Sequence, residues 1–294
     1  MSIQTTMSKK PDFIIIGAMK CATSTLHTQL ALQPGIFMTT PKEPNFFSDD
    51  AQYARGLSWY EALFQGAKPE DLCGESSTHY TKLPDYPKCV ERLSSYLPNV
   101  KLIYVMRHPI DRLVSHYIHQ WSQKVFSCDI NQAVDQYEEL IAYSCYAKQL
   151  QPYLEAFGKP NILPVFFETL TLQPQQELER IAQFIGYNSP VTWQEERSTQ
   201  NVSNERIKRF IGYEFLVESE VMTALRRILI PQFIRDRVKK NLTMQDRPTL
   251  NTQHIEALTN IFDKDLNILG SWLGIELCCE NFARSVSAEH LTWK

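Results

Sequence analysis

The stretch Phe13 to Leu30, FIIIGAMKCATSTLHTQL, decides the fold. Its first five residues form an apolar run that is typical of a buried strand, and residues 23–32 favour a helix. Between the two stand Gly17, Lys20 and then hydroxyl side chains at Thr23, Ser24 and Thr25. A strand that turns tightly into a helix points free backbone N–H groups and the positive end of the helix dipole at one place. We therefore expect an anion to bind at this turn.

The turn differs from the phosphate-binding loop of nucleoside triphosphatases. In that loop the order is glycine, four residues, glycine, lysine and then serine or threonine. Aligned on Gly17, this chain has Ala22 in place of the second glycine and Thr23 in place of the lysine, while Lys20 comes three residues earlier. We expect the loop to bind a shorter anionic chain than a triphosphate.

Strands and helices alternate along most of the chain. Strands are expected over residues 13–17, 72–75, 101–106 and 161–167, and helices over residues 23–32, 86–97, 129–140, 146–157, 174–186 and 252–273. Apolar residues at helical spacing after Pro109 predict one more helix, whose opposite face carries Arg112, Ser115, His116 and His119. This alternation indicates an α/β fold, with a parallel central sheet flanked by helices.

The size, charge and cysteine content of the chain exclude several classes of protein. Its 294 residues, 43% of them hydrophobic, suit a single domain over residues 1–294, with 1–11 expected to be flexible. The net charge of −3 gives no broad positive field, so we expect no nucleic-acid partner. The apolar runs are shorter than the ~20 residues of a membrane span, which predicts no transmembrane segment and a cytoplasmic location. Seven cysteines without a Cys-x-x-Cys pair predict no metal site.

A second anion site is expected where the strand 101–106 ends. A triphosphatase has an acidic residue there that helps to hold magnesium, but this strand ends in Arg107. Arginine would bind an anion directly, and Ser115, about 9 Å along the next helix from Pro109, could clamp the same phosphate. One alternative is that Arg107 forms a structural salt bridge at the edge of the sheet. A second is that Glu168, after the strand 161–167, supplies the acid that holds magnesium in a triphosphatase.

These stretches resemble the sulfotransferases that use 3′-phosphoadenosine 5′-phosphosulfate (PAPS). The segment IIIGAMKCATSTL is similar to the family's loop for the 5′-phosphosulfate, and VMRHPIDRLVSHY is similar to its 3′-phosphate motif. Further stretches resemble the heparan-sulfate-type and bacterial branch: PKEPNFFSDDAQYARGLSWYEALF, CYAKQLQPYLEAFG and RPTL. The resemblance covers Asp12 to Gly274, least well over residues 188–246, and implies a P-loop-like sulfotransferase fold.

The resemblance also implies a role for each candidate residue. Lys20 would bridge the 5′-phosphate and the sulfuryl group, together with the cofactor-binding loop residues Cys21, Ala22, Thr23, Ser24 and Thr25. Arg107 and Ser115 would hold the 3′-phosphate, and Arg247 would close on the same group. The implied reaction moves a sulfuryl group in line from PAPS to a hydroxyl or amine of a small-molecule or carbohydrate acceptor, without a metal ion.

The resemblance assigns the general base to Glu43, in the stretch EPNFF. Two phenylalanines nearby predict a raised pKa for this carboxyl group, although Lys42 acts in the opposite direction. From the residues alone, a solvent-exposed turn residue is the alternative for Glu43. The rival bases are His79, His108, His116 and His119, because histidine titrates near neutral pH.

Two departures from the family pattern concern the reacting centre and the loop. The stretch Glu75-Ser76-Ser77-Thr78 lacks the family's lysine, so a cationic contact at the reacting centre is missing or comes from elsewhere. Cys21 and Ala22 replace glycines, which predicts a turn without positive φ. A thiol beside Lys20 at a helix N-terminus should have a depressed pKa and be reactive, and a buried, inert cysteine is the alternative for Cys21.

Residues 188–246 are expected to form a variable segment, as an acceptor-binding part or a lid. Within them, residues 205–240 are rich in arginine and lysine. A packed helix with a basic outer face is the simplest interpretation, and a lid over an anion or a membrane-surface contact is the alternative. The competing functions are a magnesium-dependent kinase or other P-loop NTPase, and a non-catalytic nucleotide-binding protein.

Overall fold

Five parallel strands form one central sheet in the computed structural model, which describes residues 9–197, 244 and 246–294. The strands are β1 (Phe13–Gly17), β2 (Ile36–Met38), β3 (Leu72–Ser76), β4 (Lys101–Met106) and β5 (Ile162–Phe166). Their order across the sheet is β2-β3-β1-β4-β5, and every neighbouring pair is parallel. The chain leaves β1 toward β2 and later crosses back over β1 to reach β4. The strand order therefore reverses between β1 and β4, which is where sheets of this type bind ligands.

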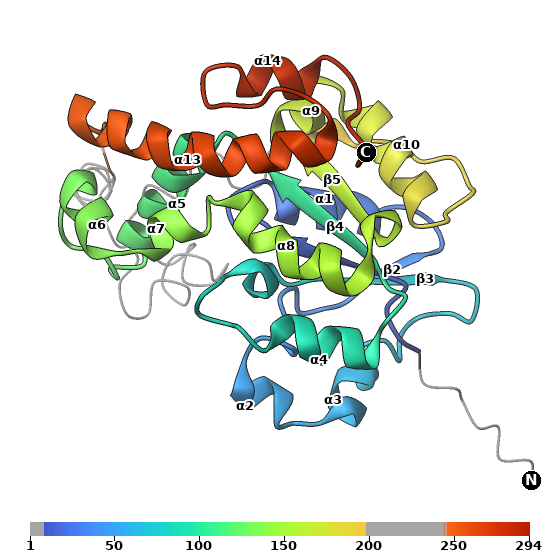
Figure 1. Cartoon of the computed structure of the whole chain (residues 1–294). Helices are drawn as coiled ribbons and strands as arrows, with labels where there is room; N and C mark the ends of the chain where they lie inside the picture. The colour runs from blue at the N-terminus through green and yellow to red at the C-terminus, as the bar shows by residue number, and fades with distance from the viewer. Residues whose placement is uncertain (1–8, 198–243, 245) are drawn as a thin grey trace, which may run out of the picture.

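Helices cover both faces of the sheet. They are α1 (Thr23–Ala31), α2 (Asp50–Tyr53), α3 (Leu57–Ala62), α4 (Cys89–Tyr96), α5 (Pro109–Ser122), α6 (Ile130–Gln136), α7 (Glu139–Ala142), α8 (Tyr146–Phe157), α9 (Phe167–Leu172), α10 (Pro174–Phe184), α13 (Thr252–Leu273) and α14 (Phe282–Ser287). In Figure 1, α8 and α13 lie in front of the strands and α1 lies behind them. Parallel crossovers are right-handed, so the step from β1 to β2 and the steps toward β4 and β5 place their helices on opposite faces.

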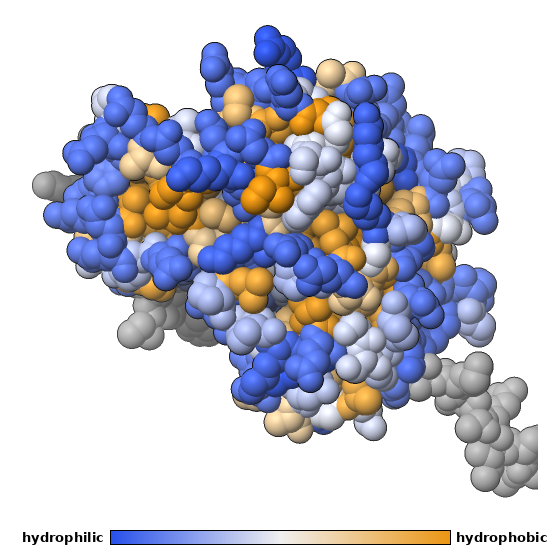
Figure 2. Space-filling view, viewed as in Figure 1, coloured by the Kyte–Doolittle hydropathy of each residue, from blue (hydrophilic) through white to orange (hydrophobic). Residues whose placement is uncertain are grey.

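The central strands are buried on both faces. Every residue of β1 and of β5 is buried, as is every residue of β4 after Lys101. Such continuous apolar runs are what a parallel sheet covered by helices requires. Hydrophilic side chains cover most of the face in Figure 2, with apolar patches between them. Among the described residues, the helices are too short or too polar to cross a membrane.

The predicted α/β fold with a parallel central sheet is confirmed. The expected strands 13–17 and 101–106 and the expected helices 146–157 and 252–273 have the observed bounds. The expected helix 129–140 is two helices, α6 and α7, because Tyr137 has extended backbone angles, φ −121° and ψ 95°. The strand β2 was not predicted.

Several predictions fall on residues outside the described part of the chain. They concern residues 1–8 of the expected flexible start, the basic segment 205–240, and most of the variable segment 188–246. Of that last segment, the structure describes residues 188–197, which end in a short 3₁₀ helix, Glu195–Arg197, together with residues 244 and 246. The single domain over residues 1–294 stays a prediction.

Candidate active site

The turn between β1 and α1 is built from left-handed backbone conformations. Lys20 has φ 72° and Ala22 has φ 63°. The prediction of a turn without positive φ was wrong, because the chain must reverse within a few residues to bring the start of α1 back over β1. Ala22 is the N-cap of α1 and makes no side-chain hydrogen bond to the helix. The first backbone N–H groups of α1 therefore remain available to an anion.

Gly17 has no room for a side chain at the end of β1. Its φ is 154°, and a Cβ atom built on it would lie 2.0 Å from the Oγ1 atom of Thr81. That hydroxyl donates a hydrogen bond of 2.8 Å to the carbonyl oxygen of Ile16. We expect Gly17→Ala to lower the free energy of unfolding by about 3 kcal/mol, because it combines backbone strain with a steric clash.

Urea unfolding of Gly17→Ala measures this effect, and Gly56→Ala is the matched control. Gly56 also has positive φ, 82°, but a Cβ atom added to it would meet no other atom within 4 Å. Its replacement should therefore cost about 1 kcal/mol from backbone strain alone. Equal losses in the two variants would show that the close approach of Thr81 to Gly17 does not matter.

Arg107 lies directly after β4, and hydrogen bonds of its backbone to the Tyr146 hydroxyl hold it in place. Its N–H donates to the hydroxyl oxygen of Tyr146 at 3.2 Å, and its carbonyl oxygen accepts from the same hydroxyl at 2.5 Å. The guanidinium lies 4.6 Å from the ring centroid of Phe167, the first residue of α9. This cation–π contact orients the charged group without neutralising it.

One cavity of about 750 Å³ collects most of the predicted site residues. Its lining includes Lys20, Ala22, Thr23, Ser24, Thr25, Glu43, Arg107, Ser115 and Arg247. Cys21 is the predicted site residue that does not line it. Their roles stay predictions, but the structure places segments that are far apart in sequence around one space.

The strand order explains how this cavity is arranged. Lys20 follows β1, Arg107 follows β4 on one side of it, and the 3₁₀ helix Thr78–Thr81 follows β3 on the other. Adjacent strands are about 4.8 Å apart, so the carboxyl ends of β1 and β4 lie within reach of one small ligand. Glu43 joins the β3 side, because its Oε1 atom accepts from the Thr78 hydroxyl at 3.3 Å.

Glu43 has a lowered pKa, contrary to the prediction. Burial would raise the pKa of this carboxyl group, but the charge and hydrogen bond of Lys42, at 2.6 Å from Oε1, lower it, and Lys82 and His79 act in the same direction. Phe46 packs into the core instead, 4.7 Å from the ring of Tyr60. The Glu43 side chain is 32% exposed, so it is neither a fully solvated turn residue nor a desolvated acid.

Cys21 is buried and chemically protected, which makes the prediction of a reactive thiol wrong. Its side chain is 0% exposed. Burial raises the pKa of the thiol to about 12, although Arg112 and Arg107 lower it. The side chain points into the core because the turn lifts its neighbours Lys20 and Ala22 toward the cavity.

Two of the four rival histidines line the cavity. His79 and His119 belong to its lining, whereas His116 is buried and stacks on Tyr143. His108 contacts the carbonyl oxygen of Cys279 through Nε2 at 3.1 Å. Burial lowers the pKa of His79 to about 4, so its ring is neutral at pH 7. His79 and His119 are therefore the rivals of Glu43 that the geometry leaves.

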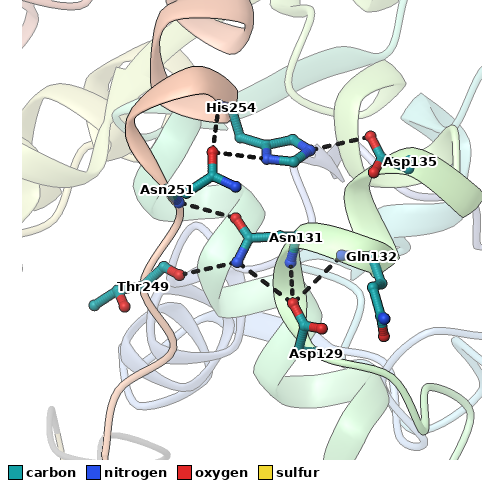
Figure 3. A network of polar contacts seen from close by, with 7 residues as sticks. All are labelled: Asp129, Asn131, Gln132, Asp135, Thr249, Asn251 and His254. Atoms are coloured by element: carbon teal, nitrogen blue, oxygen red, sulfur yellow. Dashed lines mark hydrogen bonds and ion pairs between the residues drawn. The ribbon is translucent and has the colours of Figure 1, made fainter.

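Arg247 reaches the cavity from the segment before α13. Its guanidinium pairs with Oδ1 of Asp111 at 2.6 Å, and both side chains are half exposed. The chain after it is fixed to α6, since the N–H of Asn251 donates to Oδ1 of Asn131 at 2.9 Å (Figure 3). Asn251 also caps α13 by accepting from the N–H of His254 at 2.8 Å. These bonds anchor the segment that carries Arg247.

Phe167 and Lys82 are among the lining residues that the sequence did not single out. Phe167 follows β5, and its place at the carboxyl end of a strand beside β4 was a usable signal. Lys82 lies one residue after the 3₁₀ helix Thr78–Thr81, and no local pattern marks it. Within the described ranges, no group of three or more His, Cys, Asp or Glu side chains could hold a metal ion.

A parallel sheet with a cavity at its reversal point, lined by Lys20, Arg107 and the first turn of α1, defines an α/β protein with a site that suits an anionic ligand. The family model described as a sulfotransferase domain matches residues 10–270. The chain therefore belongs to the sulfotransferase family, and the predicted family is confirmed.

Relatives of known name support this assignment. The heparan sulfate glucosamine 3-O-sulfotransferase 3B1 of Mus musculus is 30% identical over 191 residues, which cover 62% of this chain and 47% of the relative. The heparan sulfate glucosamine 3-O-sulfotransferase 6 of Homo sapiens is 29% identical over 191 residues, which cover 62% of this chain and 54% of the relative. The chain spans about half the length of these curated relatives.

A solved structure has the same fold. The sulfotransferase from Alicyclobacillus acidocaldarius matches with a TM-score of 0.64 and 22% sequence identity. The match covers 92% of this chain and 98% of that chain. It confirms the predicted P-loop-like sulfotransferase fold.

Proposed function

We propose that the chain is a PAPS-dependent sulfotransferase that transfers a sulfuryl group to a hydroxyl or amine of a small-molecule or carbohydrate acceptor. The observation that supports it most is the single cavity lined by Lys20, Arg107 and Glu43. Two cations on neighbouring strand ends suit a donor with two separated anionic groups. The carboxylate of Glu43 suits a base that takes the proton of the acceptor.

Each residue has a defined task in this proposal. The first turn of α1 and Lys20 bind the 5′-phosphosulfate, and Arg107, Ser115 and Arg247 bind the 3′-phosphate. Glu43 takes the proton of the acceptor as the new bond from the acceptor to sulfur forms. The bond from sulfur to the phosphate oxygen breaks, and Lys20 stabilises the charge that develops on that oxygen. The products are the sulfated acceptor and adenosine 3′,5′-bisphosphate (PAP).

Family membership favours this function over a magnesium-dependent kinase. The loop lacks a lysine at the start of α1, and Arg107 stands where a metal-binding acid would follow β4. Glu168, the alternative acid after β5, accepts the backbone N–H of His108 at 2.9 Å through Oε1. That hydrogen bond gives Glu168 a structural task in holding the turn after β4.

The proposals for the acceptor class and the location are supported by the relatives, the net charge and the cysteines. The names of the relatives point to a sugar hydroxyl, while the net charge of −3 disfavours a long polyanionic polysaccharide. All seven cysteines are free thiols. Free thiols are typical of proteins in reducing compartments, which supports a cytoplasmic location.

A screen of acceptors with labelled PAPS tests the function. The protein is incubated with PAPS carrying labelled sulfate and with a panel of sugars, phenols, aliphatic alcohols and amines, in the presence of EDTA. We expect label in at least one acceptor and stoichiometric formation of PAP. Transfer of phosphate from ATP with magnesium, and no sulfate transfer to any acceptor, would overturn the proposal.

A further inference from the structure

Lys82 is a buried lysine that faces the cavity. Its residue is 9% exposed, and it lines the same space as Lys20 and Glu43. Among the described residues its ammonium has no hydrogen bond or ion pair, and it lies 5.6 Å from the centroid of the Tyr143 ring. A lysine that is this buried and has no ion pair is costly to the fold, which points to a functional reason for its presence.

Glu43 does not form an ion pair with Lys82. The Oε1 atom of Glu43 is already paired with Lys42 at 2.6 Å. Burial lowers the pKa of Lys82 to about 8, the charge of Glu43 raises it, Arg112 lowers it and Asp85 raises it. Lys82 thus keeps its proton in most molecules at pH 7, and it supplies positive charge beyond what the local carboxylate neutralises.

The residue before Lys82 places this charge beside the end of β1. The hydroxyl of Thr81 donates to the carbonyl oxygen of Ile16 at 2.8 Å and lies against Gly17, at the start of the loop that carries Lys20. Lys82 is also close enough to Glu43 for each charge to shift the pKa of the other. In the proposed function this is the part of the cavity where the acceptor and the sulfuryl group meet.

We propose that Lys82 binds the sulfuryl group of PAPS directly through its ammonium. This inference rests on the proposed function. While the acceptor oxygen bonds to sulfur and the bond from sulfur to the phosphate oxygen breaks, Lys82 offsets the charge on the sulfuryl oxygens. It keeps its own proton throughout, because the acceptor proton goes to Glu43.

The comparison of PAPS with PAP tests this inference without a known acceptor. PAP lacks the sulfuryl group, so a contact to that group affects the affinity for PAPS alone. In calorimetric titrations in the presence of EDTA, Lys82→Met should weaken the affinity for PAPS about 10-fold, or about 1.4 kcal/mol. The affinity for PAP should change less than twofold. Lys82→Arg should recover part of the affinity for PAPS. Lys88→Met is the control, because Lys88 is exposed and pairs with Asp50 at 3.2 Å.

The outcomes separate the inference from the proposed function. If the unchanged protein does not bind PAP, the proposed function fails. If the unchanged protein binds PAP, but Lys82→Met changes the affinities for PAPS and PAP equally or not at all, only the role of Lys82 fails. A purely structural role is tested by the melting temperature, which should stay equal or rise in Lys82→Met because a buried unpaired charge is removed. If neither Lys82→Met nor Lys82→Gln folds, the lysine is structural and the assignment is overturned.

Discussion

Replacing Lys20 by methionine is expected to lower kcat for sulfuryl transfer about 1000-fold. Lys20 holds its position in the turn with φ 72° and lines the cavity beside the first turn of α1. In our account its ammonium stabilises charge that appears on the leaving phosphate oxygen only as the bond to sulfur breaks. The loss should therefore fall on kcat more than on the affinity for PAP, which lacks that bond. Single-turnover kinetics with labelled PAPS and calorimetric binding of PAP measure the two effects.

Lys124→Met is the matched control for this experiment. Lys124 also has positive φ, 62°, and its side chain is exposed. The two replacements therefore leave the same kind of backbone strain and remove the same side-chain charge. A kcat in Lys20→Met within tenfold of that in Lys124→Met would contradict the role of Lys20.

Glu43→Gln is expected to lower kcat by about 10² to 10⁴-fold while PAPS still binds, since this is the range that general bases contribute. Glutamine keeps the size of the side chain and can still accept from Thr78, but it cannot take the acceptor proton. Because the cations around it hold the pKa of Glu43 below its ordinary value, the carboxylate is ionised at neutral pH. The profile of kcat/KM should therefore show no acid limb from Glu43 between about pH 6 and pH 8.

The two histidines of the cavity provide the comparison. His79→Gln and His119→Gln remove the rival bases that the geometry leaves. Each should reduce kcat less than Glu43→Gln does. A larger loss in either histidine variant, together with near-normal turnover in Glu43→Gln, would transfer the role of base to that histidine.

Strong local patterns predicted the sheet and the longest helices. The run FIIIG is apolar throughout, and the helix α13 carries a helical repeat with an Asn251 cap before it and Gly274 after it. Such elements are defined by their own residues. The strand β2 has three residues and forms by pairing with β3, so its own sequence carries little signal.

The site residues predicted from the sequence line the cavity, except Cys21, but the electrostatics of the cavity were predicted less well. Motif spacing located Lys20 and Arg107, which the fold brings to adjacent strand ends. The pKa of Glu43 depends in part on Lys82, which follows a different strand and is far away in the sequence. The direction of the Cys21 side chain depends on backbone angles at Lys20 and Ala22 that the residue types do not favour. Contacts between distant segments and strained turns are the features that sequence patterns do not encode.

Three of the described cations that line the cavity follow three neighbouring strands of the sheet. Arg107, oriented by Phe167, lies after β4, while Lys20 lies after β1 and Lys82 after β3. Three positive groups around one cavity suit a ligand with several anionic groups. The three residues lie in the turns and loops that follow the strands, not within the strands themselves.

Binding of PAP and of adenosine 5′-phosphate in the presence of EDTA tests the central claim most directly. We expect the protein to bind PAP without a metal ion and at least about 100-fold more tightly than adenosine 5′-phosphate, a difference of about 2.7 kcal/mol. Arg107→Ala should remove most of that preference, because it leaves the 3′-phosphate without its charged partner. Equal affinities for the two nucleotides, or binding that requires magnesium, would contradict the claim that Lys20 and Arg107 hold opposite ends of one adenosine bisphosphate.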